Sequence, residues 1–168
     1  MKIVFSIIIS VFLFCISVSS AAQFNKQLCK RNEVIVFAFQ LKNKKWVSVC
    51  KEKNENYIVY RFGSAGKIEL QFPSVLDSTS WKQFAFKGFS RVGGKINAAM
   101  NYAFLHFAIK DVIYEVYDTW NYEDNADNCG ISITIDKKTI DKPGTLKSRK
   151  GYLLSLRGNN KIKLEEEN

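Results

Sequence analysis

The chain has 168 residues, and its 25 Lys and Arg side chains outnumber its 16 Asp and Glu side chains, which gives a formal net charge of +9. A single histidine means that any histidine-dependent mechanism or metal centre would rest on one residue. The length fits one domain with its own hydrophobic core, and the charge favours anionic partners.

The first 22 residues have the pattern of a signal peptide. Lys2 provides a positive start, residues 3–18 form a mainly apolar run, and small residues follow at Ser20-Ala21-Ala22. The run is shorter than the roughly 20 residues that a membrane-spanning helix needs. Cleavage is therefore favoured over a retained anchor, and the mature protein is expected in the periplasm or outside the cell.

The mature region is expected to be one β domain over residues 23–158, followed by a flexible charged tail over residues 159–168. Short β-branched and aromatic runs alternate with polar, glycine-containing turns, which predicts an all-β fold. Seven to nine short antiparallel strands would form a sandwich or a flattened barrel with little helix. A turn or two of helix is expected only at 96–102. The predicted strands cover residues 34–41, 46–50, 57–62, 67–72, 81–92, 102–109, 112–119, 131–136 and 152–156.

Side-chain alternation selects one register for the hairpin formed by residues 57–62 and 67–72, which we call the first hairpin. In Tyr57–Phe62 and Lys67–Phe72 the even positions are apolar, so they should share the core face. The register that achieves this places Arg61 opposite Glu69 on the outer face. As an exposed pair they would contribute only a few tenths of a kcal/mol.

The second hairpin carries the single histidine. A two-residue turn at Lys110-Asp111 would pair residues 102–109 with 112–119 and set His106 opposite Glu115. The carboxylate favours the charged imidazole and so raises its pKa. We interpret the pair as structural, because no nucleophile on a sharp exposed turn accompanies it. A hydrolase using His106 and Glu115 is kept as an alternative.

Cysteine usage allows one disulfide. If Cys15 is removed with the leader, Cys29, Cys50 and Cys129 remain, so one thiol is left over. Cys29 and Cys50 are the favoured pair, because they flank one short strand pair and export permits oxidation. No C-x-x-C spacing occurs, and the acidic residues between 118 and 127 miss the alternating calcium-loop pattern. No metal or cofactor is therefore expected.

Basic residues near the C-terminus are the leading candidate for a binding surface. Such a patch would attract anionic lipid, glycan or protein, although a solvated face is the simpler interpretation. The candidate residues are Lys142, Lys147, Arg149, Lys150 and Arg157.

Two segments carry a resemblance to known families. Tyr57-Ile-Val-Tyr-Arg-Phe-Gly63, followed by Lys67-Ile-Glu-Leu-Gln-Phe-Pro73 and preceded by Val47-Ser-Val-Cys50, resembles a group of small exported Gram-negative bacterial proteins of unknown function. The resemblance covers about residues 29–120 and implies export without a particular activity. The chain is also weakly similar to the periplasmic lysozyme inhibitors.

That weaker similarity implies an inhibitory loop, and the nearest stretch here is Gly63, Ser64, Ala65, Gly66 and Lys67. The residue order differs and the following Tyr is missing, so the site is not transferred. A strongly basic chain would also repel basic lysozymes.

The sequence thus favours a monomeric, exported, non-catalytic binding protein at the bacterial envelope or outside the cell. Its partner would be an unidentified protein or an anionic envelope component and not nucleic acid. A lysozyme-inhibitor-like protein and a hydrolase are the alternatives.

Overall fold

The computed structural model describes residues 27–165, so the expected signal peptide, residues 1–22, lies outside the described part. No helix within that part is long and apolar enough to cross a bilayer. The described residues form strands and two short 3₁₀-helices. In chain order these are β1 (Glu33–Leu41), β2 (Trp46–Glu52), β3 (Ile58–Ser64), β4 (Lys67–Phe72), η1 (Ser78–Gln83), β5 (Ala85–Arg91), β6 (Met100–Ile109), β7 (Val112–Asn121), β8 (Ala126–Ile135), β9 (Lys138–Gly151), η2 (Leu153–Leu156) and β10 (Lys163–Leu164).

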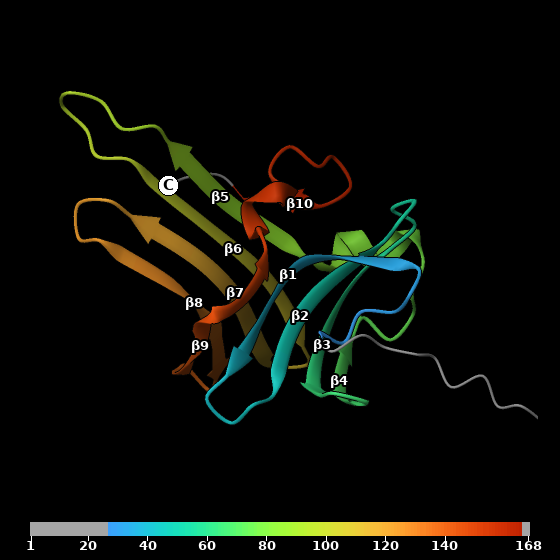
Figure 1. The fold of residues 1–168 in the computed structure, drawn as a ribbon. Coiled ribbons are helices and arrows are strands. Elements are labelled where there is room, and N and C mark those ends of the chain that lie inside the picture. Colours follow the sequence, from blue (N-terminus) through green and yellow to red (C-terminus); the bar gives the residue numbers. More distant parts are fainter. Residues whose placement is uncertain (1–26, 166–168) are drawn as a thin grey trace, which may run out of the picture.

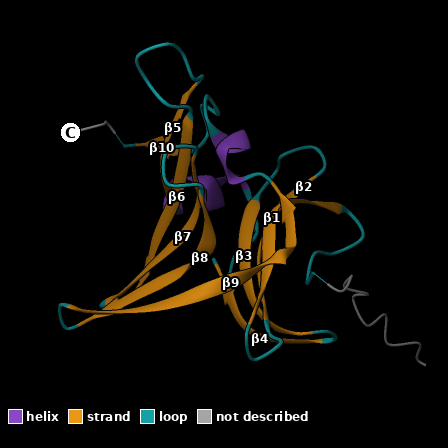
Figure 2. Cartoon of the chain, turned by 60° about the vertical axis from the view of Figure 1, so that its left-hand side comes forward, coloured by secondary structure: helices purple, strands orange, loops and turns teal. Residues whose placement is uncertain are grey.

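All of these strands belong to one sheet, which curls into a half-barrel (Figures 1 and 2). The strand order is β10-β5-β6-β7-β8-β9-β1-β2-β3-β4. The all-β prediction is confirmed, although ten strands replace the expected seven to nine. The purely antiparallel expectation also needs correction, because β10 runs parallel to β5.

The long strand β9 joins the two halves of the sheet (Figure 2). Its first part, up to Pro143, pairs with β8, and its second part, from Gly144, pairs with β1. Pro143 cannot donate a backbone hydrogen bond, which suits the point where the partner changes. Gly144 is required there because a Cβ would collide with the ring of Phe39 and the sulfur of Cys129. The sequence analysis did not predict this strand.

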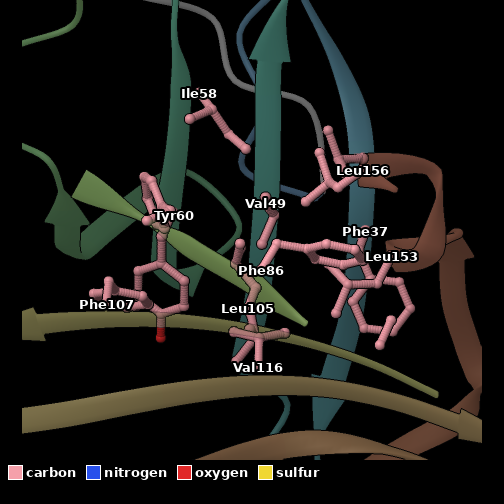
Figure 3. Close-up of a cluster of buried hydrophobic side chains, with 14 of the residues drawn as sticks. Phe37, Val49, Ile58, Tyr60, Phe86, Leu105, Phe107, Val116, Leu153 and Leu156 are labelled. Atoms are coloured by element: carbon pink, nitrogen blue, oxygen red, sulfur yellow. The ribbon is translucent and has the colours of Figure 1, made fainter. Parts of the chain in front are cut away.

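The core fills the concave side, between the two halves (Figure 3). Tyr60 of β3 packs on Phe107 of β6 with ring centroids 4.7 Å apart. Phe72 of β4 stacks on the same Phe107 ring at 4.8 Å. Leu153 and Leu156 of η2 close one side of this cluster. Contacts between aromatic rings therefore hold β3 and β4 against β6, although these strands share no backbone hydrogen bonds.

The predicted register of the second hairpin is confirmed. Strands β6 and β7 pair from Ile109 opposite Val112 to His106 opposite Glu115 and beyond. The two-residue turn and the long alternating runs leave only one register that buries the apolar face.

The predicted register of the first hairpin is wrong by two residues. Arg61 lies opposite Gln71, not Glu69, and a β-bulge follows at Phe62/Gly63. Gly63 permits the bulge, because a Cβ there would collide with the carbonyl oxygen of Lys67. A shift of two residues keeps every side chain on its predicted face, so alternation alone could not detect it.

Arg61 does lie on the outer face, but that face is not solvent-exposed. The N-terminal segment covers it: Leu28 packs with Ala38 and Trp46, and the neighbouring Cys29 forms a second small cluster. Arg61 is consequently 0% exposed and forms an ion pair with Glu33. The expected surface pair is thus a buried one with a different partner.

Three local expectations also need correction. The predicted strand 81–92 divides into η1 and β5, because Asp77 caps η1 by accepting a hydrogen bond from the Thr79 amide. Residues 152–156, predicted as a strand, contain η2. Residues 96–102 are not helical, since β6 begins at Met100.

Part of the segment expected to be a flexible tail lies against the sheet. Ile162 is buried in the main core, and Lys163–Leu164 form β10 beside β5. Burial of the Ile162 side chain explains this docking, whereas Leu164 is exposed and contributes backbone pairing with β5.

Candidate functional site

One open end of the half-barrel, beside the β1–β2 turn, contains a cavity of about 540 Å³. This volume falls within the range of small-molecule sites. The walls come from both halves of the sheet, and apolar side chains make up most of them. The lining residues are Leu41, Lys42, Asn43, Tyr60, Phe62, Leu70, Tyr114, Ile131, Ile133, Asp141, Lys142 and Pro143.

The cavity exists because the apolar faces of the two halves are only partly covered at this end. Phe62 and Leu70 on β3 and β4, and Tyr114 and Ile133 on β7 and β8, are half-buried at the edge of the main core. Deeper in the molecule, Tyr114 stacks on Phe107 at 4.9 Å with a 3° angle between the rings. The aromatic core therefore forms the floor of the cavity, and the half-buried side chains form the walls.

Two phenol groups are the polar elements of the apolar wall. Tyr60 and Tyr114 have ring centroids 6.4 Å apart, and neither hydroxyl forms a hydrogen bond with another described residue. Burial raises the pKa of Tyr60 far above its ordinary value, so its hydroxyl stays protonated. A phenol can both donate and accept a hydrogen bond, so this wall can serve a ligand with one polar group along an apolar body.

Two lysines stand at the rim of the cavity. Lys42 lies in the β1–β2 turn and Lys142 lies on β9, and both are exposed. The pairing of Leu41 with Gly144 brings the turn alongside this part of β9. Neither lysine forms an ion pair with a described residue, whereas nearby Asp141 accepts a hydrogen bond from the Tyr117 hydroxyl at 3.0 Å. Asp141 also lines the cavity, so the rim presents two lysines without ion-pair partners and one carboxylate, a net positive charge, above mainly apolar walls.

The other residues of the predicted basic patch occupy different environments. Lys147 and Lys150 on β9 and Arg157 after η2 are exposed and do not line the cavity. Arg149 forms ion pairs with two carboxylates of β7 and β8, at 3.1 Å from Asp118 and 2.5 Å from Asp127. Its hydrogen bond to Asp127 raises the pKa of Arg149, and its charge is already compensated.

The histidine pair lies on the outer face of β6 and β7. His106 Nε2 is 2.6 Å from Glu115 Oε2, and Nδ1 is 3.2 Å from Glu165 Oε2 just beyond β10. The hydrogen bond to Glu115 raises the pKa of His106, while burial and Lys87 oppose this change. Within residues 27–165 the ring nitrogens contact carboxylates and no hydroxyl or thiol. Two carboxylates therefore hold the imidazole ring in place from its two nitrogens.

The stretch compared with an inhibitory loop is a tight turn. Gly63 and Ser64 end β3, Lys67 begins β4, and only Ala65 and Gly66 connect them. Ser64 pairs directly with Lys67, so little chain projects beyond the sheet.

The three cysteines among residues 27–165 offer no reactive group at the surface. Cys29 and Cys50, the pair that the sequence favours, form a disulfide. Glu33 lies close to both sulfurs, but a disulfide has no thiolate to give to a metal. Cys129 is free and buried, and burial raises the pKa of its thiol to about 11.

Sequence reasoning identified Lys142 by the density of basic residues but missed Lys42 and the apolar walls. Comparison with protein-family models, with curated proteins and with solved structures found no match to the chain.

Proposed function

We propose that the mature protein is a non-catalytic binding protein that takes a small amphipathic anion into the cavity of the half-barrel. The observation that carries the proposal is the coincidence of mainly apolar walls with two unpaired lysines at the rim. An anionic headgroup would lie between Lys42 and Lys142, and an apolar chain would extend toward Phe62 and Ile133. The signal-peptide pattern and the Cys29–Cys50 disulfide support action in the periplasm or outside the cell.

The ligand class follows from the two parts of the site. Apolar walls stabilise a hydrocarbon chain by removing it from water, at about 25 cal/mol per Å² of buried apolar area. The exposed lysines add an attraction of about 0.2–1 kcal/mol each, which favours an anion over a cation or a neutral molecule of the same shape. A polar sugar or a nucleotide fits less well, because its polar groups would lose their hydrogen bonds to water and find few partners on the apolar walls.

Binding of dodecanoate, measured by isothermal titration calorimetry, tests the proposal. The double variant Lys42→Glu/Lys142→Glu should weaken binding by about tenfold, because it replaces attraction with repulsion. The matched control Lys147→Glu/Lys150→Glu changes the net charge equally but away from the cavity, and it should leave the affinity within about twofold. Ile133→Trp should abolish binding by filling the cavity.

Three results would contradict the proposal. Equal weakening by both charge-reversal variants would mean that the overall charge, not the rim, attracts the anion. Stronger binding of dodecyltrimethylammonium than of dodecanoate would contradict the assigned role of the lysines. Unchanged binding in Ile133→Trp would place the ligand elsewhere.

A further inference from the structure

A second surface of unusual composition lies at the far end of the sheet. The connections between β5 and β6 and between β7 and β8 project together beyond the body of the half-barrel (Figure 1). They carry three strongly exposed apolar or aromatic side chains: Val92 is 90% exposed, Ile96 is 94% exposed and Tyr122 is 70% exposed. We call these three residues the tip.

The two connections support each other. The backbone amide of Tyr122 donates to the carbonyl of Ala99 at 3.0 Å, which joins the β7–β8 turn to the β5–β6 loop. Within that loop, Arg91 Nε donates to the Ala98 carbonyl at 3.0 Å. The ring of Trp120 lies 6.4 Å from that of Tyr122, edge to face. The tip side chains are therefore presented outward by a hydrogen-bonded platform.

The charges around the tip are balanced. Arg91 and Lys95 belong to the β5–β6 side, and Glu123 and Asp124 belong to the β7–β8 turn. The two basic and two acidic residues beside the tip therefore add no net charge that would oppose its insertion into an apolar medium. Without residues 1–22 the chain loses only Lys2 from its formal +9 and carries +8, so the molecule would be drawn to an anionic surface.

The tip is too small for a stable protein interface. Three side chains cannot supply the roughly 800 Å² per partner that specific protein complexes bury. A lipid bilayer needs no shape complementarity, and its interface accepts aliphatic side chains below aromatic rings such as those of Tyr and Trp. The combination of protruding aliphatic residues, adjacent aromatic rings and a positive molecule fits a bilayer best.

We propose that the tip docks the protein on an anionic phospholipid bilayer. Val92 and Ile96 enter the boundary between headgroups and acyl chains, and Tyr122 lies at headgroup level. This inference does not depend on the cavity, because Tyr114 at the cavity and Tyr122 at the tip lie near opposite ends of β7. A docked molecule would hold the cavity away from the lipid surface.

Co-sedimentation with phospholipid vesicles tests this docking. The protein is used without residues 1–22, because the described fold begins at residue 27 and the apolar leader would itself bind lipid. Vesicles of phosphatidylcholine containing phosphatidylglycerol should bind the protein more strongly than vesicles of phosphatidylcholine alone. The variant Val92→Ser/Ile96→Ser should lower the partition coefficient by about tenfold or more.

The control makes the same chemical change elsewhere. Val75 and Ile113 are 60% and 51% exposed and lie outside the tip. Val75→Ser/Ile113→Ser should leave vesicle binding within about twofold of the wild type. Circular dichroism of both variants verifies that the β fold is retained.

Several results would overturn the proposal. These are no binding of the wild type, equal binding to both kinds of vesicle, or equal loss in the tip and control variants. Sedimentation equilibrium provides a further test, because a wild-type dimer that the tip variant abolishes would assign the tip to a second copy of the chain instead.

Discussion

Replacing Arg61 with alanine should destabilise the protein more than any other loss of a single charge among the described residues. The guanidinium contacts both oxygens of Glu33, at 2.6 and 2.8 Å, and also the Leu28 carbonyl at 3.1 Å and the Gln71 side chain at 2.9 Å. Both side chains of the ion pair are 0% exposed. Removal of Arg61 would leave the Glu33 carboxylate without its compensating charge.

The expected loss follows from the contacts that remain. Removing one partner of a buried ion pair typically costs about 3–5 kcal/mol. Glu33 would keep two other donors, the Lys30 amide at 2.6 Å and the Tyr57 hydroxyl at 2.9 Å. These hydrogen bonds still stabilise the carboxylate, so we expect the lower end, about 3 kcal/mol in the free energy of unfolding.

Urea unfolding followed by circular dichroism, with the disulfide intact, measures this loss. Lys45→Ala is the matched control, because it breaks an exposed pair with Glu69 at 2.6 Å and should cost at most about 1 kcal/mol. The double variant Arg61→Met/Glu33→Met removes both buried charges and should be more stable than Arg61→Ala. A loss in Arg61→Ala no larger than in Lys45→Ala would refute the reasoning.

The same pair predicts a pH dependence. Burial alone would raise the pKa of Glu33, but hydrogen bonds from Arg61 and the Lys30 amide outweigh it and hold the pKa below the ordinary value of 4.5. A lowered pKa means that this contribution to stability is complete above the unfolded value and is lost as the pH falls through the folded value. In Arg61→Ala the loss of stability on acidification should therefore be smaller than in the wild type.

Three further predictions concern the histidine and the cysteines. An NMR titration should give His106 a pKa above its ordinary 6.5, since the hydrogen bond to Glu115 outweighs burial. Glu115→Gln should lower that pKa, and a wild-type pKa below 6.5 would contradict the geometry. The stabilisation from His106 should be complete below 6.5 and be lost as the pH rises through the folded pKa. Cys29→Ser/Cys50→Ser opens a link between residues 21 positions apart and should cost about 3 kcal/mol in urea unfolding, so a loss under about 1 kcal/mol would count against it. Cys129, with a pKa of about 11, should resist iodoacetamide at pH 8 until urea unfolds the chain, and equal rates with and without urea would disagree with its burial.

The two hairpins show which parts of the fold the sequence determines by itself. For β6 and β7 a two-residue turn and ten-residue strands define one register, and the pairing of His106 with Glu115 followed correctly. For β3 and β4 the bulge at Gly63 changes the register by two residues while keeping the faces unchanged. Side-chain alternation reports the face of a residue and not its partner, so only tertiary structure reveals the partner of Arg61.

Side-chain alternation also could not predict that the outer face of β1–β3 is buried. Alternation assumes that the polar face of a strand meets water, but here the segment around Leu28 and the disulfide cover the outer face of β1–β3. An arginine is compatible with either environment when a carboxylate lies nearby. Glu33 comes 28 positions earlier in the sequence and no local signal connects it with Arg61.

Strand β9 escaped prediction because most of its residues are exposed and it lacks apolar alternation. Pro143 and Gly144 mark the point where β9 leaves β8 and joins β1. This change of partner has a direct effect on the cavity. It brings Lys142 beside the turn that carries Lys42, although 100 positions separate them in the chain.

The cavity walls could not be predicted from the sequence either, because their residues have the same alternation as ordinary core positions. Phe62, Leu70 and Ile133 face inward like their buried neighbours, and only their place near the strand ends leaves them half-covered. The sheet has two unjoined edges, at β4 and β10, so the half-barrel closes through aromatic packing around Phe107 and not through backbone pairing. Where that packing ends, the two halves diverge and the cavity begins. The size of the cavity therefore depends on how far the aromatic core extends along the strands. Phe107→Ala should enlarge the cavity toward the core and lower the free energy of unfolding by about 3–5 kcal/mol.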